Sequence, residues 1–194
     1  MNKGEKTRQF IIEKTAPIFN VKGYAGTSLS DMTEATGLTK GSIYGHFANK
    51  DEVALAAFDY NLQQVMQTVR REMEQKNTIR EKLAVFIAVY NNFLKQPLHG
   101  GCPILNTAVE ADDTHPALRK KAADAIHNWK KMLVQLIETG IKQQDISPTV
   151  HAEQLALTII ATIEGAMMIS KLTGKPAYHK LIMASVENMV KYPG

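Results

Sequence analysis

Residues 27–51 read TSLSDMTEATGLTKGSIYGHFANKD and constrain the fold more than any other part of the chain. Ser28 is a favourable N-cap residue, and Asp31 three positions later completes a capping-box pattern. The helix that begins here is expected to end at Gly37, because glycine readily adopts the left-handed conformation that terminates helices. A second helix follows within a few residues. The segment therefore predicts two short helices joined by a tight turn.

The second helix, predicted at residues 40–47 after an N-cap at Thr39, has an unusual composition. It contains two glycines, which are poor helix formers, and only Ile43 and Phe47 are expected to face the core. Its other side chains are small or polar, which suits close approach to a partner. Helix-turn-helix proteins present such a helix to the base edges and phosphates of DNA. A generic helical hairpin with a weak second helix is the alternative interpretation.

The sequence GSIYGHFANKD at residues 41–51 resembles the signature of the TetR/AcrR family of bacterial transcriptional regulators. In that family a glycine, an aliphatic residue before tyrosine, an aromatic residue or histidine before phenylalanine, and a lysine before an acidic residue recur at this spacing. Residues 19–29 are similar to the family's first helix and its exit loop, and the resemblance covers residues 6–58. Pro17 departs from the family pattern and is expected to kink the first helix.

DNA contacts are predicted at the start of the first short helix and around the second. The predicted residues are Thr27, Ser28, Thr39, Lys40, Gly41, Ser42, Tyr44, Gly45, His46 and Lys50. Tyr44 and His46 are expected to reach phosphates or base edges, whereas Lys50, at the start of a helix, suits a phosphate.

The composition is that of a globular protein. The chain has 194 residues, of which 44% are hydrophobic and 22% charged, enough to bury a substantial core. Its net charge of +4 agrees with nucleic-acid binding without establishing it. The single cysteine, Cys102, excludes an intrachain disulfide and fits a reducing compartment. The N-terminus has no signal-peptide pattern, and polar residues interrupt the apolar stretch 155–169, so we expect a cytoplasmic protein without a membrane span.

Helical periodicity runs through the whole chain, without the alternation that is typical of strands. We predict an all-α protein of about nine helices, with an N-terminal helix-turn-helix DNA-binding domain at residues 1–50 and a C-terminal helical ligand-binding and dimerisation domain at residues 51–194. The helices are predicted at residues 5–22, 29–36, 40–47, 50–76, 78–96, 103–111, 116–142, 147–173 and 178–191.

Residues 150–172 are apolar on two faces, so a helix here must be covered on both sides. One face can belong to the domain core and the other to a subunit interface, or the helix can be the centre of a monomeric bundle. Because one short recognition helix reads few bases, we expect a dimer on a pseudopalindromic site. The family resemblance implies that two C-terminal helices from each subunit form the interface. The predicted interface residues are Leu155, Ile159, Thr162, Ala166, Ile169, Ile182, Val186 and Met189.

The family resemblance also implies an effector pocket in the C-terminal domain. The candidate lining residues are Phe86, Tyr90, Phe93, Cys102, Asn106, Trp129, Met132, Leu133, Ile163, Glu164, Met167 and Met168. Most of them suit an ordinary core equally well, since methionines at helical spacing usually fill gaps. Glu164 is a carboxylate among apolar neighbours, and it needs a partner that is either a ligand or an adjacent helix.

Cys102 lies in the segment GGCPILN, residues 100–106, just before a predicted helix. The helix dipole favours a thiolate at this position, and a thiolate could sense oxidants or electrophiles. The alternative is a small packed side chain that sets the turn, because free cysteines are commonly buried and inert.

Catalytic, cofactor and metal sites are not indicated. The six histidines are scattered, and the patterns HExxH, GxSxG, GxxxxGK[ST] and GxGxxG are absent. We therefore predict a DNA-binding repressor that a small molecule releases from a pseudopalindromic operator. Its partners would be double-stranded DNA, the effector and a second copy of the chain. Alternative hypotheses are a regulator that senses redox state through Cys102, and a helical enzyme or small-molecule carrier with a purely structural N-terminal hairpin.

Overall fold

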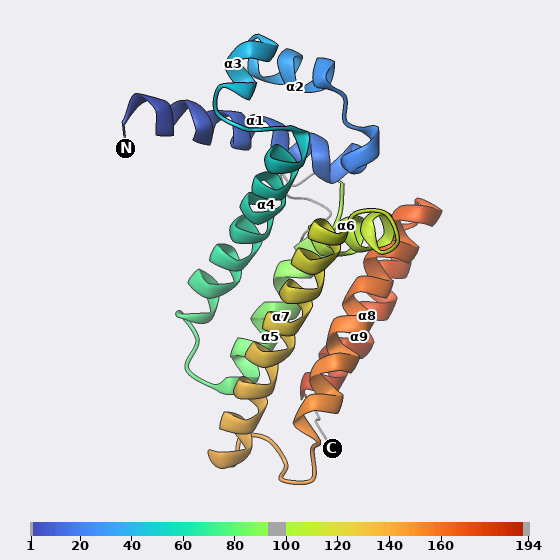
Figure 1. Cartoon of the computed structure of the whole chain (residues 1–194). Helices are drawn as coiled ribbons and strands as arrows, with labels where there is room; N and C mark the ends of the chain where they lie inside the picture. The colour runs from blue at the N-terminus through green and yellow to red at the C-terminus, as the bar shows by residue number, and fades with distance from the viewer. Residues whose placement is uncertain (1, 93–99, 192–194) are drawn as a thin grey trace. The chain divides into compact units, whose positions relative to one another are not determined.

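The computed structural model describes residues 2–92 and 100–191, in which there are nine α-helices and no strand (Figure 1). The predicted all-α fold is confirmed. The helices are α1 Lys3–Gly26, α2 Leu29–Thr36, α3 Lys40–Tyr44, α4 Lys50–Met73, α5 Ile79–Asn92, α6 Pro103–Ala111, α7 Pro116–Lys142, α8 Ala152–Thr173 and α9 Pro176–Lys191.

The chain divides into two compact units by its internal contacts. The first unit comprises residues 1–65 and 97–123, and the second comprises residues 66–96 and 124–194, so α4 and α7 contribute to both. The predicted boundary at residue 50 separates a DNA-binding part from a ligand-binding part. The two compact units are defined by contacts alone, so the predicted boundary stays a prediction.

The first unit has a core shared by α1, α2, α3 and the start of α4. α1 packs against α2 and α6, and α2 packs against α3. The buried apolar side chains of this core are Ile11, Ile12, Ala16, Phe19, Met32, Ile43, Phe47, Val53, Ala54 and Ala57. Because both short helices are anchored here, the core determines which side chains of α3 face outward.

α1 keeps helical backbone angles through Pro17, so the proline does not end the helix. The φ of a proline ring is compatible with a helix, but the missing N–H and the contact of the ring with the preceding turn favour a bend, so the expected kink at Pro17 stays a prediction. The irregular residue is Gly23, with φ 73° and ψ 179°, in the left-handed region that glycine adopts without steric penalty. The chain therefore changes direction at Gly23.

α3 ends at Tyr44, three residues before the predicted end at residue 47. The N–H of Gly45 donates to the carbonyl of Gly41 at 2.9 Å, and the N–H of His46 donates to the carbonyl of Ile43 at 3.0 Å. The second of these bonds spans only three residues, so it tightens the last turn and closes the helix.

α8 begins at Ala152, later than the predicted residue 147. The N–H of Val150 donates to the carbonyl of Ser147, which makes residues 147–150 a turn, and His151 then caps α8 through a bond from the N–H of Gln154. α2, α6 and α7 occupy the predicted residues, as do the starts of α3 and α4 and the ends of α8 and α9, and the remaining described helix ends differ by a few positions.

The second unit contains α5, α8, α9 and the C-terminal parts of α4 and α7. α9 packs against both α8 and α5. By length and composition alone, α8 is the one helix among the described residues that is long and apolar enough to cross a membrane, a test that the core helix of a helical bundle also passes. In its most apolar window 44% of the helix is buried inside the unit, as in the core helix of a helical bundle.

Candidate DNA-binding surface and effector region

The helix-turn-helix contains the capping bonds that the sequence predicts. Ser28 Oγ accepts from the N–H of Asp31 at 3.1 Å, and Asp31 Oδ2 accepts from the N–H of Ser28 at 2.7 Å. Gly37 ends α2 in the left-handed conformation, with φ 67°. Thr39 Oγ1 accepts from the N–H of Ser42 at 3.2 Å and so caps α3. These bonds satisfy backbone groups that helix ends otherwise leave without partners.

Most of the predicted DNA-contacting residues lie at the surface of the first unit. Ser28, Thr39, Lys40, Gly41 and Gly45 are exposed, and Ser42, Tyr44, His46 and Lys50 are partly exposed. On the opposite side of α3 and its exit, Ile43 and Phe47 are buried in the core. The segment thus combines an anchored apolar side with an outward polar side.

Thr27 is the exception among these residues. Its side chain is fully buried, and its hydroxyl donates to the carbonyl of Gly23 at 2.6 Å. Thr27 therefore closes the connection between α1 and α2 and is not available to DNA. We remove it from the predicted contact set.

Lys50 has neighbours that the sequence analysis did not identify. Its Nζ lies 4.5 Å from the centroid of the Tyr24 ring, which is a cation–π geometry. The Tyr24 hydroxyl donates to Asp51, and this bond together with burial raises the pKa of Tyr24 to about 12. His115 packs edge-on against Tyr24, with its Nε2 3.9 Å from Asp51 Oδ2. Three separate segments meet here, and no motif in the sequence relates them.

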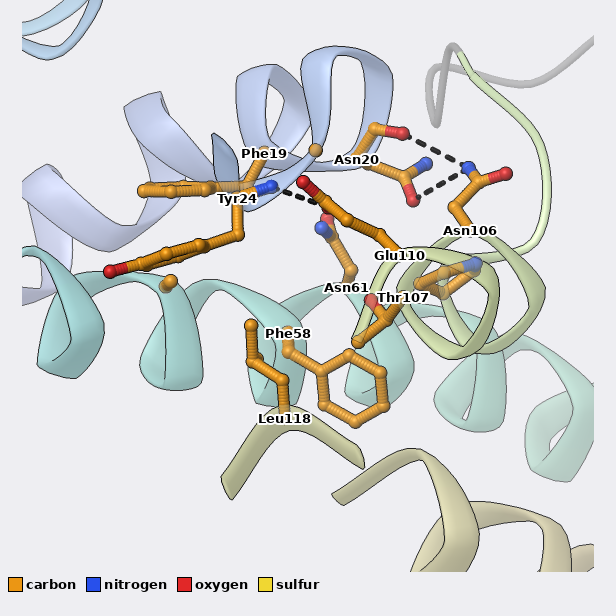
Figure 2. A pocket seen from close by; sticks show the side chains of 12 residues that line it. Phe19, Asn20, Tyr24, Phe58, Asn61, Asn106, Thr107, Glu110 and Leu118 are labelled. Atoms are coloured by element: carbon orange, nitrogen blue, oxygen red, sulfur yellow. Dashed lines mark hydrogen bonds between the residues drawn. The ribbon is translucent and has the colours of Figure 1, made fainter. Parts of the chain in front are cut away.

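α6 holds the end of α1 through two polar side chains, Asn106 and Glu110 (Figure 2). Asn106 Nδ2 donates to the carbonyl of Asn20 at 3.0 Å. The Glu110 carboxylate accepts from the N–H groups of Tyr24 at 2.6 Å and Ala25 at 2.7 Å. Asn106 therefore serves contacts within the first unit, which revises its assignment to the effector pocket. Glu110 was missed because its partners are backbone groups, which leave no sequence signature.

A cavity lies beside these contacts, among α1, α4 and α6 (Figure 2). Its volume is about 20 Å³, enough for a single water molecule. Asn61 is buried in its wall and donates to the carbonyl of Ala16 at 2.8 Å. Pockets for drug-sized ligands measure about 300–1,000 Å³, so this cavity does not accommodate an effector in the present conformation.

Cys102 is 1% exposed and occupies the N-cap position of α6, without a side-chain capping bond. Reactive cysteines are at least partly accessible. Its burial therefore favours the packing interpretation over the sensor. Cys102 also belongs to the first unit, as does Asn106, whereas the other described effector candidates belong to the second.

The effector candidates of the second unit gather around three aromatic rings. Phe86, Tyr90 and Trp129 have ring centroids 5.0–5.3 Å apart in all three pairs. Phe86, Tyr90, Trp129, Leu133, Ile163 and Met167 are buried, and Met132 and Glu164 are partly buried. Met168 is 47% exposed, so its assignment to a pocket is corrected: the helix turns this side chain outward. Phe93 lies outside the described residues.

Three of the predicted dimer-interface residues lie on the side of α8 or α9 that faces the chain's own core. Ile159, Ala166 and Val186 are buried within the chain's own core and have no free surface for a partner. Leu155, Thr162, Ile169, Ile182 and Met189 are partly exposed. The large exposed apolar side chains of α8 and α9 are Leu157, Met168, Leu172, Tyr178 and Leu181. When a helix is apolar on nearly every side, the spacing of its apolar residues does not show which side packs against the core of its own chain.

Comparison with known proteins matches both parts of the chain to described families. Residues 11–57 match bacterial regulatory proteins of the tetR family, and residues 80–186 match the tetracyclin repressor-like C-terminal domain. The first match spans α2 and α3, and the second spans the residues of the aromatic cluster.

Individual proteins show the same relationship. A TetR-family transcriptional regulator from Cytophaga hutchinsonii is 48% identical with a TM-score of 0.91, over 98% of this chain and 96% of its own. A TetR transcriptional regulator from Chloroflexus aurantiacus is 39% identical with a TM-score of 0.92, over the same shares. The HTH-type transcriptional repressor DhaR of Mycobacterium sp. (strain GP1) is 26% identical over 171 residues, which are 85% of this chain and 82% of DhaR.

The family matches cover most of the chain, and the Cytophaga hutchinsonii structure matches 98% of it. The capped α2–turn–α3 unit lies inside the matched N-terminal region. This protein is a DNA-binding transcriptional regulator of the TetR family.

Proposed function

We propose that the protein is a homodimeric cytoplasmic repressor that binds a pseudopalindromic operator and leaves it when a small molecule binds its C-terminal domain. The observation that carries this proposal is the α2–α3 pair, whose apolar side is anchored in the core while its polar side is open to solvent. Repression is further supported by the relative DhaR, which is itself a repressor.

The DNA contacts proposed are those of the exposed and partly exposed residues around α3. Lys40 and Lys50 supply positive charge for phosphates, and Tyr44 and His46 supply hydrogen-bonding groups for phosphates or base edges. Ser28 lies at the start of α2, where helix N-terminal N–H groups attract phosphate. Neither short helix reads more than a few bases, so affinity and specificity require two copies of the unit.

The proposed subunit interface uses the exposed apolar stripe of α8 together with α9. Leu157, Met168 and Leu172 follow one another at steps of eleven and four, which place them on one face of α8. Leu181 on α9 is 70% exposed, and Leu172 is 82% exposed. Large apolar side chains with so much exposure at neighbouring elements indicate an association surface. The partly exposed residues Ile169 and Ile182 remain in the proposed set.

The effector is proposed to bind at the aromatic cluster of Phe86, Tyr90 and Trp129. Trp129 Nε1 donates to Met66 Sδ at 3.1 Å, so the cluster is coupled to α4, the helix that begins beside α3. Because the rings are buried, a ligand must displace them to bind. The ligand therefore has a higher affinity for the conformation with displaced rings than for the closed conformation. Such a difference is required for any ligand to shift an equilibrium. A lipophilic or aromatic compound suits this lining.

The test is operator binding by fluorescence anisotropy, with DNA fragments from around the protein's own gene. We expect specific binding whose affinity falls steeply as salt rises, because the protein displaces counterions from phosphates. Binding that is absent for every fragment, or that salt does not affect, would refute the regulator and return the helical enzyme or carrier to consideration. Peroxide-dependent release that requires Cys102 would favour the redox alternative over a small-molecule effector.

A further inference from the structure

The backbone near the end of α1 is irregular at Gly23. In a continuous helix the N–H of Tyr24 would donate to the carbonyl of Asn20. Here Gly23 is left-handed, the Asn20 carbonyl accepts from Asn106, and the N–H of Tyr24 donates to Glu110. Side chains of α6 thus replace both partners of the missing bond: Asn106 is the donor for the Asn20 carbonyl, and Glu110 is the acceptor for the Tyr24 N–H.

Glu110 binds this irregular end with both carboxylate oxygens. Oε2 accepts from the N–H of Tyr24 at 2.6 Å (Figure 2). Oε1 accepts from the N–H of Ala25 at 2.7 Å. Asn106 lies one helical turn earlier on the same face of α6. Hydrogen bonds from N–H groups to a charged carboxylate are short and stronger than neutral ones. The exit of α1 is therefore held at two adjacent residues by one side chain.

Gly23 fits this arrangement in a second way. A Cβ atom at this position would lie 2.3 Å from Glu110 Oε2 and 2.7 Å from its Cδ. The glycine thus provides the left-handed φ and also the space into which the carboxylate reaches. Both residues are needed for the contact, although they are 87 positions apart.

Tyr24 also contacts two residues at the start of α4, Lys50 and Asp51. Its N–H is held by Glu110, its hydroxyl donates to Asp51, and its ring lies 4.5 Å from Lys50 Nζ. Lys50 is the first residue of α4 and a proposed phosphate contact. A chain of direct contacts therefore runs from α6 through Tyr24 to Lys50, entirely within the first unit.

We propose that Glu110 is a positioning residue for DNA binding, which holds Tyr24 and through it keeps Lys50 in place for a phosphate. This inference rests on the proposed phosphate contact of Lys50. Glu110 itself touches no DNA in this scheme. It acts by fixing the backbone on which the Tyr24 ring depends.

The first variant is Glu110→Gln, which preserves the size of the side chain and removes its charge. Neutralising a carboxylate ordinarily strengthens DNA binding, because it removes repulsion from phosphates. We expect the opposite here, an operator affinity reduced about 5- to 10-fold. The matched control is Asp113→Asn, which neutralises an exposed carboxylate just beyond α6 and should leave affinity unchanged or slightly higher.

The salt dependence separates positioning from a general loss of folded protein. Each phosphate contact contributes about 0.9 to the slope of log Kd against log salt, so a dimer that loses Lys50 from both sites should lose about two from that slope. A reduced fraction of folded protein would lower the apparent affinity and leave the slope unchanged. In a Lys50→Ala background, Glu110→Gln should have no further effect on affinity, because the contact it serves is already gone.

Two results would overturn the proposal: wild-type affinity and slope in Glu110→Gln, or effects of Glu110→Gln and Lys50→Ala that add. If Glu110→Gln does not fold, Tyr24→Leu removes the ring that lies beside Lys50 Nζ without altering α6. Wild-type affinity and slope in that variant would overturn the proposal equally. The proposed function fails separately, if the unmodified protein binds no DNA. Wild-type binding by Lys50→Ala would refute the Lys50 contact, and the inference with it, while leaving the proposed function standing.

Discussion

Tyr44 is the residue on which the proposed DNA interface can be tested most directly. It is the last residue of α3, partly exposed and packed on its inner side against the core of the first unit. Tyr44→Ala should weaken operator binding by about 1–3 kcal/mol, the contribution of one good contact. Tyr44→Phe, which keeps the packing and removes only the hydroxyl, separates the hydrogen bond from the ring. A sharp fall in melting temperature, with DNA binding per folded molecule unchanged, would make Tyr44 a core residue instead.

The burial of Cys102 favours a packing role over a sensor role. At 1% exposure its thiol has little access to oxidants, so Cys102→Ser should retain operator binding and release by effector. Peroxide or an electrophile should leave the operator affinity of the wild type unchanged, as measured by anisotropy before and after treatment. Loss of DNA binding in the wild type, but not in Cys102→Ser, would instead make the protein a thiol-based switch.

At the scale of elements, the end of α2 depends on the left-handed conformation of Gly37, φ 67°. A Cβ there would contact nothing within 4 Å, so the cost of Gly37→Ala is the backbone conformation alone, about 1–2 kcal/mol. Thermal unfolding should show a decrease of about 2–4 °C per kcal/mol. The matched change is Gly41→Ala within α3, where a Cβ would meet only Thr39 Oγ1 at 4.0 Å, an ordinary contact. It should raise the melting temperature because alanine is the better helix former. Equal effects of the two changes would contradict this account.

At the scale of the whole molecule, the proposed dimer depends on the exposed apolar face of α8 and α9. Leu181→Glu places a charge on a side chain that is 70% exposed in the isolated chain, so the folded subunit should tolerate it. Sedimentation should show a shift from dimer to monomer at micromolar concentration, because burying an unpaired carboxylate in an interface is costly. Operator binding should fall with it. Leu181→Met is the control and should remain dimeric. A dimeric Leu181→Glu protein would place the interface elsewhere.

The free energy of unfolding of the whole molecule should depend on pH through His179. His179 on α9 is 2% exposed, and burial lowers the pKa of its imidazole below the ordinary 6.5. Below pH 6.5 the unfolded chain binds a proton that the folded chain does not, so the free energy of unfolding should fall as pH decreases from about 6.5 towards the folded-state pKa. Above 6.5 the residue contributes no pH dependence.

Urea unfolding between pH 7 and pH 5 measures this slope. The slope should flatten in His179→Leu, whatever the absolute stability of that variant. His127→Gln, a change at an exposed histidine on α7, should keep it. An unchanged slope in His179→Leu would assign the pH dependence to other groups.

The amino-acid sequence by itself determined the local features of this protein. Ser28 with Asp31, Gly37 and Thr39 mark the helix ends through bonds between near neighbours, and such bonds depend only on residue type and spacing. The family signature at residues 41–51 is a pattern of the same short range, and α2, α6 and α7 were predicted with their observed bounds.

The tertiary structure decided everything that depends on which distant surfaces meet. It buried Thr27, turned Met168 outward, and enclosed Ile159, Ala166 and Val186 in the chain's own core, because the covered face of an apolar helix is chosen by its neighbours. It also brought Glu110 to the backbone of Tyr24 and Ala25. A carboxylate that binds main-chain N–H groups requires no particular side chain at its partners, so a contact of this kind leaves no pattern in a single sequence.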